Sequence, residues 1–124
     1  SKVMSDTTGY FTRCAQEGKF LIPVAQAVPF LNLMGTVLLG WFHLWQATVA
    51  SPRYSALLSE AGIDATDREK AGAFLEDNSE AAFMQGKVKS ARYYIRNVLP
   101  GAEALARAIQ SEDKSVLSIH NESF

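Results

Sequence analysis

FLIPVAQAVPFLNLMGTVLLGWFHLWQATVASP, residues 20–52, contains no Asp, Glu, Lys or Arg. Pro29 suits the first turn of a helix, and the composition from Pro29 to Ala50 favours one continuous helix. The apolar residues surround the axis of that helix instead of forming one stripe. A helix of this kind is either the central helix of a bundle or a membrane span.

Two observations favour the central helix of a bundle. Lys and Arg do not cluster beside the uncharged stretch, since only Lys19 and Arg53 flank it. The remaining helical segments are amphipathic, and their apolar stripes need a partner. We therefore expect the uncharged helix to be wrapped by protein on all sides, with the membrane span as the alternative.

The next segment of the chain is rich in charged and small residues. Pro52 is expected to end or bend the uncharged helix, because proline lacks an N–H donor and clashes with the preceding turn. Residues 60–78 then predict one short helix from Thr66 to Leu75. Thr66 would cap this helix, with Glu69 three residues further on.

A heptad seam defines the third major segment, Ser79 to Gln110, with Ser79 as the predicted N-cap. The apolar steps alternate between four and three residues without a slip. Because the seam continues through Pro100, the pattern predicts one helix kinked there, or two helices nearly in line. The seam consists of Met84, Val88, Ala91, Ile95, Val98, Ala102, Leu105 and Ile109.

The two ends of the chain give weaker signals. Residues 1–17 carry a short helical stripe that Gly18 would stop, and residues 111–124 show no helical periodicity. Together the segments predict an all-α fold over residues 1–124 as a single domain. The architecture expected is an up-and-down bundle of three to four main helices around a long apolar central helix.

The overall composition excludes some classes of protein. The 124 residues are 48% hydrophobic and 20% charged, as in ordinary globular domains. The net charge of -1 gives no basic excess for binding nucleic acid. A single cysteine cannot form an internal disulfide, and no secretory signal is recognisable, so we expect a cytoplasmic protein. The absence of an initiator Met suggests a fragment of a longer chain.

The chain offers little for catalysis. His43 has no second histidine or carboxylate within two helical turns, so we interpret it as a hydrogen-bonded histidine at a helix contact and not as a metal ligand. Cys14 has no neighbouring base and is expected to be a small buried hydrophobe. We therefore predict no catalytic residue, no metal site and no cofactor-binding residue in this chain.

Two groups of residues could instead form contacts with another domain or subunit. A basic stripe lies on the third segment, and an aromatic group lies on the uncharged helix. A solvated outer face and core packing are the alternative interpretations of these groups. The candidate contact residues are Trp41, Trp45, Lys87, Lys89, Arg92 and Arg96.

Three motifs resemble a known family. They are VPFLxLMGxVxLGW at residues 28–41, FxxGKxxxARYYxxxVLP at residues 83–100, and DxSVL at residues 113–117, followed by the terminal Phe124. They are similar to the C-terminal extension domain of long acyl-CoA dehydrogenases, the group that includes methylmercaptopropionyl-CoA dehydrogenase. The resemblance covers about residues 24–124 and departs from the family in the charged segment before Ser79.

The resemblance implies a parent flavoenzyme that uses FAD to oxidise an acyl-CoA thioester to its 2,3-enoyl form. The catalytic carboxylate and flavin site of such enzymes belong to the dehydrogenase core, so none is transferred to this chain. The partners implied are the core of the same polypeptide and a possible second copy. Two alternatives are a free-standing helical module that binds an apolar ligand or partner, and a small membrane protein.

Overall fold

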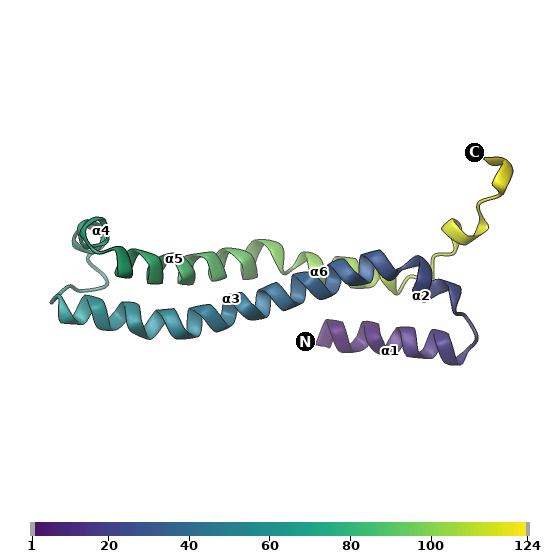
Figure 1. The fold of residues 1–124 in the computed structure, drawn as a ribbon, viewed down its shortest axis with the longest axis horizontal. Coiled ribbons are helices and arrows are strands. Elements are labelled where there is room, and N and C mark those ends of the chain that lie inside the picture. Colours follow the sequence, from purple (N-terminus) through teal and green to yellow (C-terminus); the bar gives the residue numbers. More distant parts are fainter. Residues whose placement is uncertain (1, 124) are drawn as a thin grey trace. The chain divides into compact units, whose positions relative to one another are not determined.

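The computed structural model describes residues 2–123 and is helical, with no strand in that range, which confirms the all-α fold class (Figure 1). Most of the described chain lies in six α-helices, one π-helix and two 3₁₀ turns. They are α1 (Lys2–Gln16), α2 (Leu21–Ala25), α3 (Ala27–Glu60), α4 (Arg68–Asp77), α5 (Ser79–Tyr93), η1 (Tyr94–Val98), α6 (Gly101–Ile109), η2 (Ser115–Ser118) and η3 (Asn121–Ser123).

The helix α3 continues through Pro52 to its end at Glu60, so the proline does not end it. The turn after the proline is anchored to α5. Arg53 donates two hydrogen bonds to Glu80, at 2.8 and 3.2 Å, and Tyr54 accepts one from Gln85 at 3.3 Å. These contacts hold the turn in helical geometry although Pro52 supplies no N–H group.

The short charged helix α4 begins later than expected. Asp67 is its N-cap, and the Asp67 carboxylate accepts a hydrogen bond from the Lys70 N–H at 3.1 Å. The predicted cap, Thr66, instead donates its backbone N–H to Asp64 at 2.8 Å. The capping prediction was therefore wrong by one residue, because Thr66 is held in a turn closed by the preceding aspartate.

The third predicted segment is divided in the structure. Its N-cap is Asn78 and not Ser79, since the Asn78 side chain accepts a hydrogen bond from the Ala81 N–H at 3.0 Å. After α5 the backbone forms η1 and a turn that contains Pro100, and α6 starts at Gly101. The predicted interruption at the proline is confirmed. Seven of the eight seam residues are buried or half-buried, the exception being Val98.

The residues group into two compact units. The first contains the chain up to Leu38 and again from Val98 onward, and the second contains Leu39–Asn97. The boundary on the N-terminal side falls inside α3. The expectation of a single domain over residues 1–124 stays a prediction.

The first unit has a small core between α1, the start of α3 and α6. Leu33 is fully buried against Ala102, Ala106 and Ile109. A hydrogen bond of 3.0 Å from Gln110 to Thr7 ties the end of α6 to α1. A second cluster joins α1 to α2 and consists of Tyr10, Cys14 and Ile22.

The second unit is an antiparallel helical hairpin in which the later part of α3 lies beside α5 (Figure 1). Three contacts set the register: Arg53 with Glu80, Tyr54 with Gln85, and the His43 ring 4.8 Å from the Tyr94 ring. From the His43 contact to the contacts of Arg53 and Tyr54, the residue number on α3 rises while that of the partner falls from 94 to 80 and 85, as antiparallel helices require. The two helices are joined by α4 and its flanking turns.

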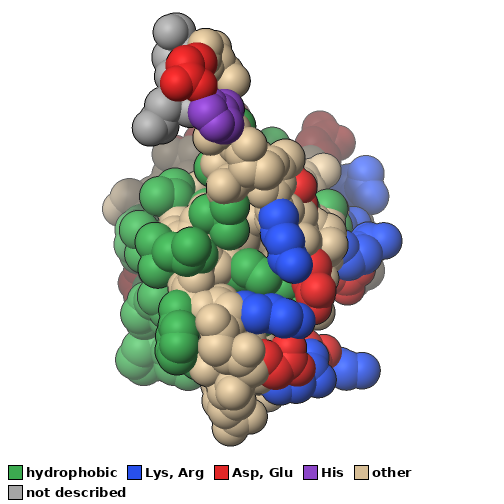
Figure 2. Space-filling view, turned by 90° about the vertical axis from the view of Figure 1, so that its right-hand side faces the viewer, with side chains coloured by type: hydrophobic (Ala, Val, Ile, Leu, Met, Phe, Trp, Pro, Cys, Tyr) green, Lys and Arg blue, Asp and Glu red, His purple; other side chains and the backbone are tan. Residues whose placement is uncertain are grey.

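The prediction that α3 is wrapped on all sides was wrong. Large apolar side chains are exposed along its length, among them Leu31, Leu39, Trp41, Trp45 and Val49. Figure 2 shows hydrophobic side chains gathered openly at one side of the face drawn. The physical reason is that each unit supplies enough neighbours to cover only one stripe of a helix that is apolar on every side.

Two leucines on the first two turns of α3 test this division into a buried stripe and an exposed one. We expect Leu33→Ala to lower the free energy of unfolding by about 2–5 kcal/mol, because it opens a cavity in the first unit. The matched variant Leu31→Ala, at a position 61% exposed, should change it by about 0.5 kcal/mol or less. Urea unfolding followed by circular dichroism measures both, and equal losses would contradict the assignment.

Candidate functional surface

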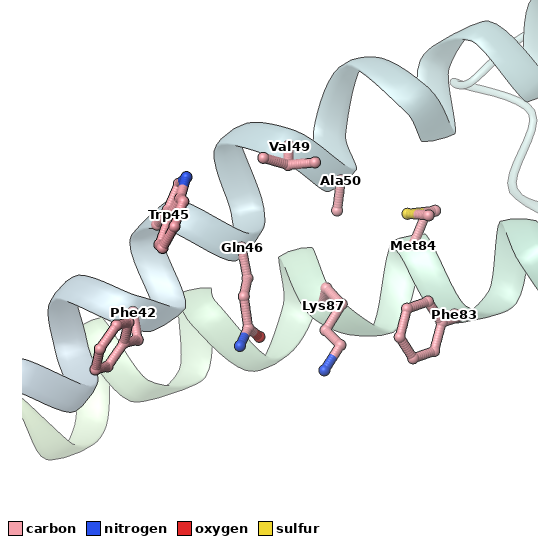
Figure 3. A pocket seen from close by; sticks show the side chains of 8 residues that line it. All are labelled: Phe42, Trp45, Gln46, Val49, Ala50, Phe83, Met84 and Lys87. Carbon is pink, nitrogen blue, oxygen red and sulfur yellow. The ribbon is translucent and has the colours of Figure 1, made fainter.

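The second unit carries an apolar groove with a volume of about 380 Å³ between the later part of α3 and α5. Figure 3 shows Gln46 and Ala50 directed from α3 toward α5, and Met84 directed from α5 toward α3. The groove is lined by Phe42, Trp45, Gln46, Val49, Ala50, Phe83, Met84 and Lys87. Six of these eight side chains are apolar, so the groove suits an apolar occupant.

The helical pairing explains why the groove exists. Small buried side chains, namely Ala50, Ala81 and Ala91, allow close contact between the helices of this unit. The lining residues of α3 recur at three- and four-residue steps, which places them on one helical face. The rings of Phe42, Trp45 and Phe83 form the walls of the groove. A two-helix pairing has no third element to cover those walls.

An aromatic cluster forms the α3 side of this surface. The Trp41 ring lies 5.6 Å from that of Phe42 and 5.7 Å from that of Trp45. Trp41 and Trp45 are 58% and 55% exposed, although tryptophan is among the side chains most stabilised by burial. Exposed aromatic clusters of this kind are typical of protein interfaces.

One positively charged side chain, Lys87, lines the groove on the α5 side. The Lys87 ammonium lies 5.0 Å from the centre of the Phe83 ring. From residue 81 to residue 102 the chain contains four basic residues and no acidic one. Within residues 2–123 none of the four forms an ion pair. The partner that this charge favours is therefore anionic.

The negative charge of the second unit is concentrated near the turn end of the hairpin. There Glu80 pairs with Arg53, and the hydrogen bonds from the guanidinium hold the pKa of the Glu80 carboxyl below its ordinary value. Glu60 lies 3.7 Å from the same guanidinium. These carboxylates are engaged with Arg53, so they leave the four basic residues of the segment after Glu80 without a counter-charge.

His43 lies in the second unit but shows no catalytic arrangement. Its ring contacts that of Tyr94, as the interpretation of a helix contact predicted. Its Nδ1 atom is buried and has no hydrogen-bond partner in the described part of the chain, so the hydrogen bond expected for this histidine is not found at that atom. Within residues 2–123 no group of three or more His, Cys, Asp and Glu side chains could hold a metal ion.

Cys14 lies in the first unit, where it is buried as the sequence predicted. It packs with Tyr10 and Ile22. Burial, together with the neighbouring thiol, raises the pKa of Tyr10 to about 12. Both groups are therefore enclosed in a small apolar cluster, and neither is presented to a substrate.

The helix α3 is the one helix within residues 2–123 that is long and apolar enough to cross a membrane, a test that considers length and composition alone. The hairpin register bears on this possibility. It places the exposed Lys89, Arg92 and Arg96 of the neighbouring helical segment level with the aromatic part of α3. Each such charge near the centre of a bilayer costs about 2.5–3.5 kcal/mol or more. Placing this hairpin in a bilayer would therefore have to offset the cost of these three charges.

The structure brings together only part of the predicted contact set. Trp45 and Lys87 both line the groove, whereas Trp41 adjoins it through its ring contacts. Lys89, Arg92 and Arg96 do not line it. A three- to four-residue recurrence counted from Phe42 would have selected Val49. The lining residues absent from the predicted contact set are Phe42, Gln46, Val49, Ala50, Phe83 and Met84.

The family model described as "Acetyl-CoA dehydrogenase C-terminal like" matches residues 2–120 of this chain. The chain is also similar to a butyryl-CoA dehydrogenase from Syntrophomonas wolfei subsp. wolfei, with 37% identity over 49 residues. That alignment includes 40% of this chain and 8% of the relative, so the chain corresponds to a small part of the relative's length. No solved structure gives a significant match.

The two tryptophans provide a direct test of the groove. We expect the isolated chain to bind the neutral apolar dye Nile red, whose emission rises in apolar surroundings. The variant Trp45→Gln should lower this emission several-fold, because it removes a groove wall. Trp41→Gln is the matched control, since Trp41 is equally exposed but does not line the groove. Equal losses for the two variants would contradict a groove at this position.

Proposed function

Since the chain belongs to the Acetyl-CoA dehydrogenase C-terminal like family, we propose that it is a non-catalytic helical domain of an FAD-dependent acyl-CoA dehydrogenase. The observation that carries the proposal is the family match, which extends over residues 2–120. The similarity to a butyryl-CoA dehydrogenase supports the same assignment. In this proposal the flavin and the catalytic carboxylate belong to the dehydrogenase core.

We further propose that the domain contributes by packing on that core or on a neighbouring subunit. Its exposed apolar surface supports this role, because soluble proteins rarely leave a wide aromatic surface in contact with water. Burial of apolar surface contributes about 25 cal/mol per Å², so covering two half-exposed tryptophans and their neighbours would stabilise an assembly substantially. The domain would therefore act on stability and assembly and not on the chemical step.

Deletion of this domain from the parent polypeptide tests the proposal. We expect the dehydrogenase without this segment to keep its flavin spectrum but to aggregate or change its oligomeric state, as measured by analytical ultracentrifugation. The isolated chain should show no flavin absorbance and no oxidation of butyryl-CoA with an artificial electron acceptor.

Two results would contradict the proposal. One is acyl-CoA oxidation by the isolated chain. The other is a deletion that leaves the assembly and thermal stability of the parent unchanged. A stable deletion variant with unchanged assembly would mean that the exposed face of α3 has no structural role in the parent.

A further inference from the structure

We propose that the groove of the second unit binds an amphipathic helix with an acidic flank, and that this helix belongs to the dehydrogenase core of the same polypeptide. This inference rests on the proposed function and specifies the place and chemistry of the contact. The groove lies between the later part of α3 and α5, and Figure 3 shows the side chains that line it.

The geometry favours a helix as the occupant. Two helices that pair side by side leave a long furrow into which a third can place side chains at three- and four-residue steps. The walls of this furrow are large and apolar, with Trp45, Val49 and Phe83 each more than half exposed. A third helix would cover all of them, whereas a small molecule in so open a furrow would leave much of their surface in water.

The charge determines which helix fits. Lys87 lines the groove and has no ion-pair partner within residues 2–123. Lys89, Arg92 and Arg96 are exposed further along the same segment, but they do not line the groove. An apolar helix with Asp or Glu on the flank that faces α5 would satisfy Lys87, and a basic helix would be repelled by it.

A second copy of this chain fits less well. In a two-fold contact the same patch faces itself, so the basic segment of one copy would approach that of the other. The helices α1 and α6 already use their apolar faces within the first unit, where Cys14 and Ile109 are buried. Under the proposed function, the dehydrogenase core is therefore the source of the helix that we favour.

Site-specific cross-linking in the full-length polypeptide tests the proposal. The photoreactive residue p-benzoylphenylalanine replaces Phe83 in one variant and Tyr93 in the other. Both positions are exposed aromatic residues of α5, but only Phe83 lines the groove. After irradiation and proteolysis, mass spectrometry identifies the linked peptide.

The expected result is an intramolecular link from position 83 to one helix of the dehydrogenase core that carries acidic residues beside its apolar face. The Tyr93 probe should not reach that helix. Lys87→Glu should lower the yield of the link about tenfold or more, and an acidic-to-lysine change in the linked helix should restore it. Lys89→Glu, outside the groove, should have a smaller effect.

The opposite results would overturn the inference. They are a link between two copies, a link to lipid, a link to a basic or non-helical segment, or no link from position 83 in a protein whose circular dichroism is unchanged. Failure of the proposed function is distinguishable, because the upstream polypeptide would then contain no flavin and oxidise no acyl-CoA. A flavin-containing parent that fails only the cross-linking test would overturn the inference alone.

Discussion

The whole structure depends on one constraint: α3 is apolar on every side, but the chain supplies neighbours for only one of its stripes. In the first unit Leu33 turns to the core while Leu31, two residues away, is exposed. In the second unit Ala50 is buried against the hairpin contact while Val49 is exposed. The buried stripe occupies roughly a third of the helix circumference, so most of the surface of α3 is left uncovered.

The same constraint explains which features sequence reasoning could reach. Helical periodicity identified the heptad seam, and Ile109 at its end is buried as predicted. Gly18 ends the first helix with a φ of 74°, in the left-handed region that glycine adopts without strain. These features are local, so they depend on the order of residues and not on what surrounds them.

Other features could not be read from the pattern. The continuation of α3 through Pro52 depends on Arg53 reaching Glu80, which is 27 residues away along the chain. Uniform apolarity indicates that a helix will be covered but not by which molecule, and we expected the cover to come from this chain. The groove likewise arises only when Trp45 and Phe83, from two helices, are brought together.

The aromatic residues of α3 could therefore be identified from the sequence, whereas the groove between α3 and α5 is defined only by the folded hairpin. Aromatic walls provide apolar contact area, and Lys87, which forms no ion pair within residues 2–123, provides a positive charge. Both properties suit a domain whose contribution is to bind other parts of a protein. The buried thiol of Cys14 and the contact between His43 and Tyr94 belong to the internal structure of each unit.

Hydroxyl-radical footprinting would test most directly the central claim that the parent polypeptide covers the aromatic face of α3. The oxidation rates of Trp41 and Trp45 are compared between the isolated chain and the full-length protein, with the exposed Tyr93 as the reference. The account predicts fast oxidation of both tryptophans in the isolated chain and several-fold protection in the parent. Equal rates in the two proteins would contradict it.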